Sequence, residues 1–356
     1  MSKVEGESSA MNSSLFEAAK KGDVHSLKEA LKKGANPNYA ARSEEGAPTS
    51  LHEAVKIQHE DGEECTRVLL ENGADIDSTL LTNCNTPLIG AAAAGADNIC
   101  RLLIEKSEER LNVESDSEDE YPGDSLQPAP KRFVSRSNSY GNTPLHAGVR
   151  AGSVETVRLL MEHDANLEAT NHVGSTLLHL CAFLCEQTET SDSIHISTTI
   201  STQSRRASCL NAVEPHVQIA AMVIASGKSG DIDSKDHNGM TALHIAAQRG
   251  CISLVKLFVD SGASLSIKTA LNYKGKGGRN AEQSAEFSGM KETKELLQQM
   301  NEMKQTDKSI IVTHNMAKDL EGGYSVRNPV VGSGGAAVRR RSYSEKRDSE
   351  TSSVSL

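Results

Sequence analysis

The amino-acid sequence predicts an all-α solenoid, in which helix-turn-helix pairs stack side by side along the chain. Two observations lead to this fold class. Similar segments recur along the 356 residues, and Gly141 and Gly174 begin two successive copies that are 33 residues apart. The chain also has no Trp and only 3% aromatic residues, which suits an array that buries small aliphatic side chains between neighbouring repeats.

The copy at 141–168 shows how one repeat is built. Thr143 is a good N-cap residue, and Pro144 takes the first helical position, where its missing N–H costs nothing. Gly152 is expected to end this short helix as a left-handed residue. Residues 157–161 then give a second helix one apolar face. The pattern therefore predicts turn, helix, turn, helix.

The chain resembles the ankyrin-repeat family in three segments: GNTPLHAGVRAGSVETVRLLMEHDANLE at 141–168, GMTALHIAAQRGCISLVKLFVDSGASLS at 239–266 and CNTPLIGAAAAGADNICRLL at 84–103. The family pattern is G-x-T-P-L-H-x-A-A-x-x-G, followed by V-x-x-L-L and G-A-D. Guided by it, four weaker copies are found at 14–38, at 46–76, at 174–182 together with 216–233, and at 278–300. The resemblance implies seven repeats over 12–303, with β-hairpin fingers between the helix pairs.

Other stretches break the pattern. Residues 114–138 are acidic, then Pro-rich, then basic, and residues 186–214 are rich in Ser and Thr. The tail at 304–356 is rich in Ser, Gly and Arg. Such compositions bury too little apolar surface to fold, so we expect two disordered insertions, a disordered tail and a flexible N-terminus at 1–11.

Composition and charge limit the function and the compartment. The net charge of -10 gives no reason to expect nucleic-acid binding, and no apolar run approaches the length of a membrane span. The seven cysteines are an odd number, and no signal peptide follows Met1. Free thiols in a reducing compartment are the simple interpretation, which places a soluble protein in the cytoplasm or nucleus.

Two groups of residues invite a metal or catalytic interpretation. In the first, the resemblance implies that one histidine of each turn ties adjacent hairpins together, and successive copies are too far apart to share one ion. These histidines are His52, His146, His179 and His244. The second is Cys181 with Cys185, which lacks the C-x2-C spacing and the second pair of a zinc knuckle. Structural histidines and buried thiols are the better interpretations, and no cofactor is expected.

The resemblance implies a non-catalytic protein–protein interaction module that acts as a scaffold, adaptor or regulatory subunit, and as a monomer. The alternative is an ankyrin-containing enzyme, or a fragment of one, with an unrecognised active site. A deep cavity lined by titratable groups would support the enzyme, and a continuous exposed face would support the binder.

In this family the hairpin tips and the first helices line a concave groove. The residues predicted to bind the partner there are Lys20, Lys21, Lys56, Ile57, Arg150, Tyr140, His172, His237, Gln248 and Arg249. Their cations favour an acidic or phosphorylated partner segment. The alternative is that exposed helix positions carry Lys and Arg for solubility.

Six serines are candidate phosphorylation sites: Ser115, Ser117, Ser139, Ser208, Ser342 and Ser344. Two follow paired arginines, in RRAS at 205–208 and RRRS at 339–342, and two lie in an acidic run. The acidic run 114–120 is also a candidate for weak competition with the partner inside the groove. Alternatively, this acidic run belongs to a solvated loop that points away from the groove.

Overall fold

The computed structural model describes residues 2–41, 46–114, 133–185, 214–270 and 278–321. The chain divides into two compact units, Met1–Lys304 and Gln305–Leu356. The first unit holds the repeats. The second is described only at 305–321, where the last helix ends.

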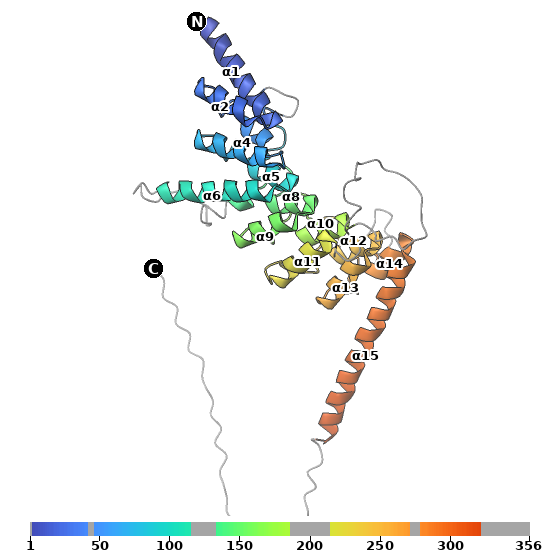
Figure 1. The fold of residues 1–356 in the computed structure, drawn as a ribbon. Coiled ribbons are helices and arrows are strands. Elements are labelled where there is room, and N and C mark those ends of the chain that lie inside the picture. Colours follow the sequence, from blue (N-terminus) through green and yellow to red (C-terminus); the bar gives the residue numbers. More distant parts are fainter. Residues whose placement is uncertain (1, 42–45, 115–132, 186–213, 271–277, 322–356) are drawn as a thin grey trace, which may run out of the picture. The chain divides into compact units, whose positions relative to one another are not determined.

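Helices of the described residues follow one another in pairs (Figure 1). The pairs are α1 (Ser2–Lys21) with α2 (Val24–Lys32), α3 (Ser50–Ala54) with α4 (Glu60–Glu71), α5 (Pro87–Ala94) with α6 (Asp97–Glu114), α8 (Pro144–Ala151) with α9 (Val154–Glu162), α10 (Leu177–Leu184) with α11 (Pro215–Ala225), α12 (Ala242–Arg249) with α13 (Ile252–Asp260), and α14 (Ala281–Phe287) with α15 (Lys291–Glu321).

Two layers of helices build the stack. The first helices of successive pairs contact one another from α1 to α14, and the second helices do so from α2 to α13. The chain is therefore an all-α solenoid of stacked helix pairs, as the sequence predicts. Helices α10 and α11 contact each other as the other pairs do, although residues 186–213, which separate them in sequence, lie outside the described part of the chain.

Local sequence explains where the first helices begin and end. In α8, Thr143 is the N-cap, Pro144 takes the first position, and Gly152 closes the helix with a left-handed φ of 67°. Each first helix from α1 to α12 also buries one leucine between its neighbours, at 0–1% exposure. These leucines are Leu15, Leu51, Leu88, Leu145, Leu177 and Leu243.

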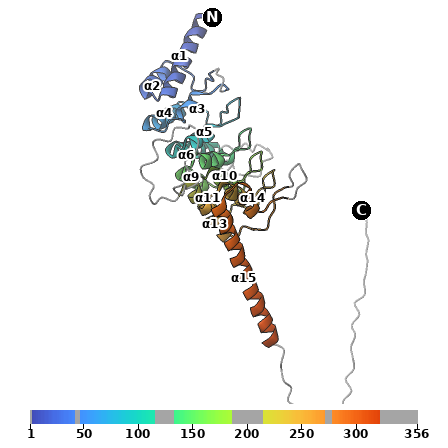
Figure 2. The same cartoon turned by 90° about the vertical axis from the view of Figure 1, so that its right-hand side faces the viewer.

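Hairpin loops precede the first helices and project from one side of the stack, to the right in Figure 2. Their ends are turns rather than regular strands. In the described residues the one isolated β-bridge joins Ala40 to Thr49. The loops are held instead by hydrogen bonds from one loop to the next.

The structure departs from the predicted boundaries at three places. Helix α1 begins at Ser2, because no proline or glycine-rich turn interrupts residues 2–11. Residues 133–138 belong to the array and not to an insertion, because Phe133 and Val134 are buried beside Ile104. Helix α15 runs to Glu321, into the predicted tail. The other residues of both insertions, at 115–132 and 186–213, and the tail from 322 lie outside the described residues.

Candidate protein-binding face

The turn histidines are structural groups that join neighbouring repeats. In each Thr-x-x-His turn the threonine N–H donates to His Nδ1 at 3.2–3.3 Å. The opposite ring nitrogen, Nε2, lies 3.0–3.4 Å from a carbonyl oxygen of the following repeat. Because Nδ1 accepts, Nε2 must carry the proton and donate to that carbonyl. Both nitrogens of each of these rings are thus engaged within the array.

Burial disfavours the charged form of these four rings. It lowers the pKa of His52, His179 and His244, and it lowers that of His146 to about 4. All four imidazoles are therefore neutral near pH 7. Protonation would add a second N–H at Nδ1 and break the bond from the threonine amide.

The two cysteines considered for a zinc corner are buried thiols. Burial raises the pKa of Cys181 to about 12, and Cys185 Sγ donates to Glu214 Oε2 at 2.8 Å. Among the described residues no group of three or more His, Cys, Asp or Glu is arranged to hold a metal ion. No helix in the same part of the chain is long and apolar enough to span a membrane.

Hairpin tips form a hydrogen-bonded row along one edge of the array. The Ser139 N–H donates to Asn83 O at 2.9 Å, and the His172 N–H donates to Tyr140 O at 2.9 Å. The next tip continues the row, where the His237 N–H donates to Val173 O at 3.0 Å. The row holds the side chains of Tyr140 and Val173 in solvent, at 61% and 52% exposure.

Five of the first helices, α3, α5, α8, α10 and α12, add three positions each beside these tips. They are the fourth, seventh and eighth residues after the N-cap, which share one side of a helix. We call the hairpin tips and these positions together the finger face. In chain order the positions are Glu53, Lys56 and Ile57 on α3 and its end; Gly90, Ala93 and Ala94 on α5; Ala147, Arg150 and Ala151 on α8; Leu180, Phe183 and Leu184 on α10; and Ile245, Gln248 and Arg249 on α12.

The character of the finger face changes along the array. Near α3 it is charged, and Lys56 Nζ lies 2.8 Å from Glu53 Oε1. Across α5 and α8 the side chains are small except for Arg150. At α10 the face becomes bulky and apolar, and Phe183 is 57% exposed. The surface of the finger face therefore differs from repeat to repeat.

A hollow of about 560 Å³ lies in the finger face between α10 and α12. Apolar side chains form much of its lining: Val173, Leu180, Phe183, Met240 and Ile245. Arg249 stands at its rim, with its guanidinium carbon 5.4 Å from the centre of the Phe183 ring. Asp236 also lines the hollow, but its Oδ1 accepts the N–H groups of Asn238 and Met240 at 2.9 and 2.8 Å.

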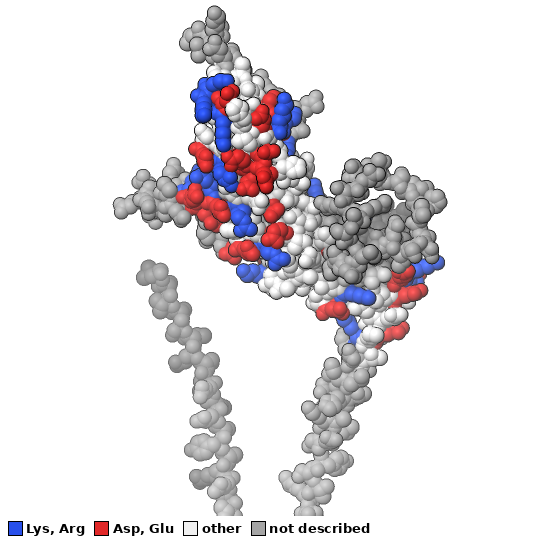
Figure 3. Space-filling view, in the orientation of Figure 1, with Lys and Arg blue, Asp and Glu red and all other residues white. Residues whose placement is uncertain are grey.

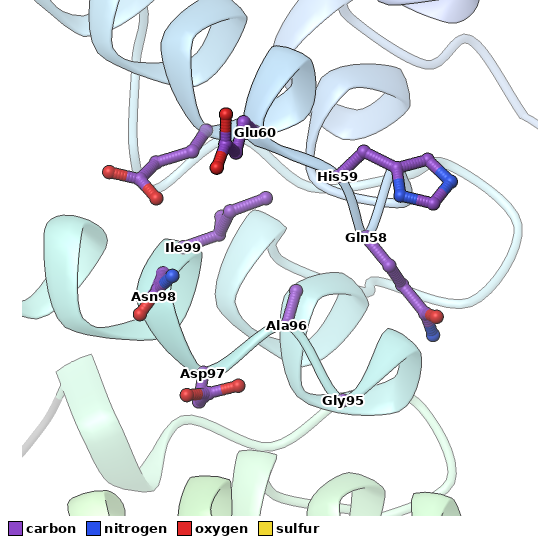
Figure 4. Close-up of a pocket in the computed structure, with 9 residues that line it drawn as sticks. Gln58, His59, Glu60, Gly95, Ala96, Asp97, Asn98 and Ile99 are labelled. Carbon is purple, nitrogen blue, oxygen red and sulfur yellow. The ribbon is translucent and has the colours of Figure 1, made fainter.

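A second, smaller pocket of about 120 Å³ lies between the loops that precede α4 and α6 (Figure 4). Figure 4 shows Glu60 and Asp97 where these two loops lead into the helices. Each begins a helix, where a carboxylate stabilises the positive end of the helix dipole. The Gln58 side-chain amide joins the loop before α4 to the end of α5 by donating to Ala94 O. These residues have a structural explanation and do not form a catalytic arrangement.

The predicted partner-binding residues lie on the first helices, just past the end of α3, or on the hairpin tips of the array. Eight of them are exposed and two are half-buried, Ile57 and Gln248. The exposed ones are Lys20, Lys21, Lys56, Arg150, Arg249, Tyr140, His172 and His237. Of the candidate phosphorylation sites, Ser139 is exposed at a hairpin tip. The other five, Ser115, Ser117, Ser208, Ser342 and Ser344, lie outside the described residues, as does the run 115–120.

The predicted set omits the apolar part of the face. Phe183 occupies the same helix position as Arg150, and Val173 the same tip position as Tyr140. The repeat register that places Arg150 and Tyr140 on this face therefore also places Phe183 and Val173 there.

Comparison with known proteins gives consistent matches. The family model "Ankyrin repeats (3 copies)" matches residues 15–115, and "Ankyrin repeat" matches 140–172 and 238–270. One relative is the transient receptor potential cation channel subfamily A member 1 of Drosophila melanogaster, 25% identical over 62% of this chain and 18% of its own length. Another is the NF-kappa-B inhibitor zeta of Homo sapiens, 26% identical over 40% of this chain.

The chain spans about a fifth of the length of these two relatives, 18% and 20%. Among solved structures, the human ASB11 ankyrin repeat domain matches with a TM-score of 0.54 and 21% identity. This match covers 80% of the chain and 96% of that domain. At such identity the likeness concerns the fold alone.

Proposed function

The chain belongs to the ankyrin-repeat family, and from that premise we propose that it is a non-catalytic module that binds another protein through its finger face. Ankyrin repeats generally mediate protein–protein interaction, because a stack of rigid repeats presents an extended surface of variable side chains. The observation that carries the proposal is the set of large apolar side chains that this face exposes. They include Tyr140, Val173 and Phe183, at 61%, 52% and 57% exposure.

An enzyme is not favoured by the described residues. Both ring nitrogens of His179, the histidine that lines the large hollow, are engaged by Thr176 and Met240 O. The other acid–base group of that lining, Asp236, is held by its own turn. Neither group is placed to move a proton to or from a substrate.

We propose further that the chain acts as a monomeric scaffold, adaptor or regulatory subunit. The relative named as an NF-kappa-B inhibitor supports a regulatory role of this kind. Free cysteines in the described residues support a location in the cytoplasm or nucleus. The cations of the finger face, such as Arg150 and Arg249, support a partner with an acidic or phosphorylated segment. Phosphorylation of the serines named above would then tune partner choice through added charge.

Charge reversal on the two sides of the same repeats tests the proposal. One variant carries Arg150→Glu and Arg249→Glu on the first helices of two repeats. Its matched control carries Arg158→Glu and Lys256→Glu on the second helices of those repeats, where both residues are exposed. Proteins captured from cell extract by the unmodified chain are quantified against both variants by mass spectrometry.

We expect a defined set of proteins to be lost from the first-helix variant and kept by the control. Both variants should unfold at similar denaturant concentrations, because all four side chains lie at the surface. Equal capture by the two variants would refute binding through the finger face.

A further inference from the structure

We propose that Cys185 and Cys251 form a reversible disulfide that fastens one repeat of the array to the next. Cys185 ends α10, in the repeat of α10 and α11, and Cys251 immediately precedes α13, in the repeat of α12 and α13. Stacking of the two repeats brings together these cysteines, which are 66 residues apart in sequence. The site is independent of the protein-binding role proposed above.

The two thiols contact each other in the packed interior. Cys251 Sγ donates to Cys185 O at 3.4 Å, and the Cys185 thiol is within hydrogen-bond reach of Cys251 Sγ. Both side chains are buried, at 1% and 3% exposure. A disulfide brings two sulfur atoms to about 2.05 Å from each other. Since the sulfur atoms are already neighbours, the bond forms by shortening one existing contact between the repeats.

The surroundings make Cys251 the thiol that reacts first. A hydrogen bond from the Cys185 thiol lowers the pKa of Cys251. Cys251 also caps the N-terminus of α13, where the helix dipole stabilises a thiolate. The pKa of Cys185 is raised by its contact with Cys251, by burial and by the Glu214 carboxylate. The thiolate, which is the nucleophile, therefore forms at Cys251.

The charges around Cys185 have the same effect. In the view of Figure 3, Lys, Arg, Asp and Glu gather over α2, α4 and α6. Helices α10 and α11, which make up the repeat of Cys185, contain none of these residues. The charged group that contacts Cys185 is the Glu214 carboxylate, whose Oε2 accepts the thiol at 2.8 Å. Cys185 is therefore held protonated until the partner sulfur has been oxidised.

Hydrogen peroxide is the oxidant that we assign to this pair. The Cys251 thiolate attacks one peroxide oxygen, so that an S–O bond forms, the O–O bond breaks, and the departing hydroxide takes up the proton that Cys251 released. Cys185 sulfur then attacks the Cys251 sulfenic acid. The S–S bond forms, the S–O bond breaks, and Glu214 passes the Cys185 proton to the departing hydroxide. Two thiols thus lose two electrons, and one peroxide becomes two waters.

Glu214 also lies on the route from solvent to the pair. Its side chain is 19% exposed, so molecules of about the size of water reach the carboxylate that contacts the Cys185 thiol. A metal ion is the other ligand that two thiols and a carboxylate suggest. The described residues contain no group of three or more His, Cys, Asp or Glu arranged to hold one. In a reducing compartment a disulfide of this kind is transient and senses oxidation.

The disulfide fixes the ends of α10 and α12 relative to each other. Phe183 and Arg249, which line the hollow from these two helices, precede Cys185 and Cys251 by two residues each. The link also closes a loop across the 66-residue separation, which removes conformational freedom from the unfolded chain. Oxidation therefore stabilises this pair of repeats and holds the two walls of the hollow together.

Mass spectrometry of the oxidised full chain tests the site. The test protein carries Cys84→Ser, which removes an exposed thiol. The folded protein is treated with hydrogen peroxide, unreacted thiols are blocked with N-ethylmaleimide, and tryptic peptides are compared before and after reduction. Cleavage after Arg249 and Lys256 places Cys251 in a peptide of its own, separate from that of Cys185.

Three variants of this protein remove the reacting groups in turn: Cys185→Ser, Cys251→Ser and Glu214→Gln. The matched control is Cys181→Ala, which removes another buried thiol of α10, one turn before Cys185. Circular dichroism checks that the helices of each variant are intact. The measurement on the Cys84→Ser protein decides the matter even where a further variant fails to fold.

We expect a peptide pair that joins Cys185 to Cys251 in the test protein and in Cys181→Ala, and that dithiothreitol separates. Cys185→Ser should instead leave a sulfenic acid at Cys251, which dimedone labels. Glu214→Gln should slow formation of the link about tenfold or more, because an amide cannot take the Cys185 proton. The oxidised protein should unfold at a urea concentration roughly 0.5–1 M higher than the reduced protein.

A folded protein that forms no such link would overturn the proposal. A link that forms as fast in the urea-unfolded chain would overturn it too, because the folded array would then not position the pair. So would a link from Cys185 to any other cysteine. An unchanged rate in Glu214→Gln would overturn the proton transfer assigned to Glu214.

Discussion

Replacing Gly141 by alanine tests whether the hairpin tips are fixed by close contact with the next repeat. Gly141 has a φ of 75°. A Cβ built at this position would lie 2.7 Å from His172 Cδ2 and 2.8 Å from the His172 backbone nitrogen. Since the second atom belongs to the backbone, the neighbouring tip must shift, and the bond from the His172 N–H to Tyr140 O must lengthen from 2.9 Å.

The loss of stability has two parts, and a second glycine isolates one of them. Alanine in the left-handed region costs about 1–2 kcal/mol, offset by about 0.4–1 kcal/mol because the unfolded chain is less free. Overpacking against the next tip adds about 1–3 kcal/mol. The matched control is Gly152→Ala, which has a φ of 67° but whose Cβ would meet nothing closer than 3.6 Å. We expect a loss of about 2–4 kcal/mol for Gly141→Ala and about 1 kcal/mol for Gly152→Ala.

Urea unfolding followed by circular dichroism gives the two free energies, and amide hydrogen exchange locates the damage. Protection of the His172 amide should fall in Gly141→Ala and persist in Gly152→Ala. Equal losses in the two variants, or an unchanged His172 amide, would show that the tips do not constrain one another.

Three further outcomes are expected. Leu243→Ala should cost about 2–5 kcal/mol in urea unfolding because Leu243 is 1% exposed, whereas the 80% exposed Leu81 should tolerate alanine within about 0.5 kcal/mol. The pKa of His146 is about 4 in the folded protein, whereas its ordinary value is 6.5. The neutral ring therefore stabilises the fold fully above pH 6.5, and this contribution to the free energy of unfolding falls by about 3 kcal/mol as the pH is lowered to 4. Unfolding free energies between pH 7 and pH 4 should therefore fall less steeply for His146→Gln. Iodoacetamide should modify the exposed Cys84 well before Cys100, whose pKa burial raises to about 12, as mass spectrometry would report.

Many elements of the repeat could be predicted from sequence because the interactions that define them are local. A threonine N-cap, a proline at the first position and a glycine at the end act within one helix, as α8 shows. Cys84 marks the limit of the pattern. It stands where four other repeats have glycine, and it has a left-handed backbone, with a φ of 55°, as three of those glycines do. The surrounding tip imposes that conformation on a residue that disfavours it.

Composition places residues 133–138 in an insertion because it averages over the whole stretch 114–138. Phe133 and Val134 are two apolar residues among charged and polar ones, but a site beside Ile104 and His163 buries them. Arg136 then adds an ion pair to Asp77, at 3.2 Å and 59 residues away in sequence. No local pattern encodes such a contact.

Sequence by itself determined the helix pairs, because they depend on spacing within a repeat, and the resemblance to the ankyrin-repeat family implied the structural role of the turn histidines. Only the tertiary structure decided how the finger face varies along the array. Phe183 and Arg249 are 66 residues apart, and the side chains that complete their hollow come from two repeats and the hairpins between them. Stacking brings these residues together, and stacking depends on the packing of whole repeats.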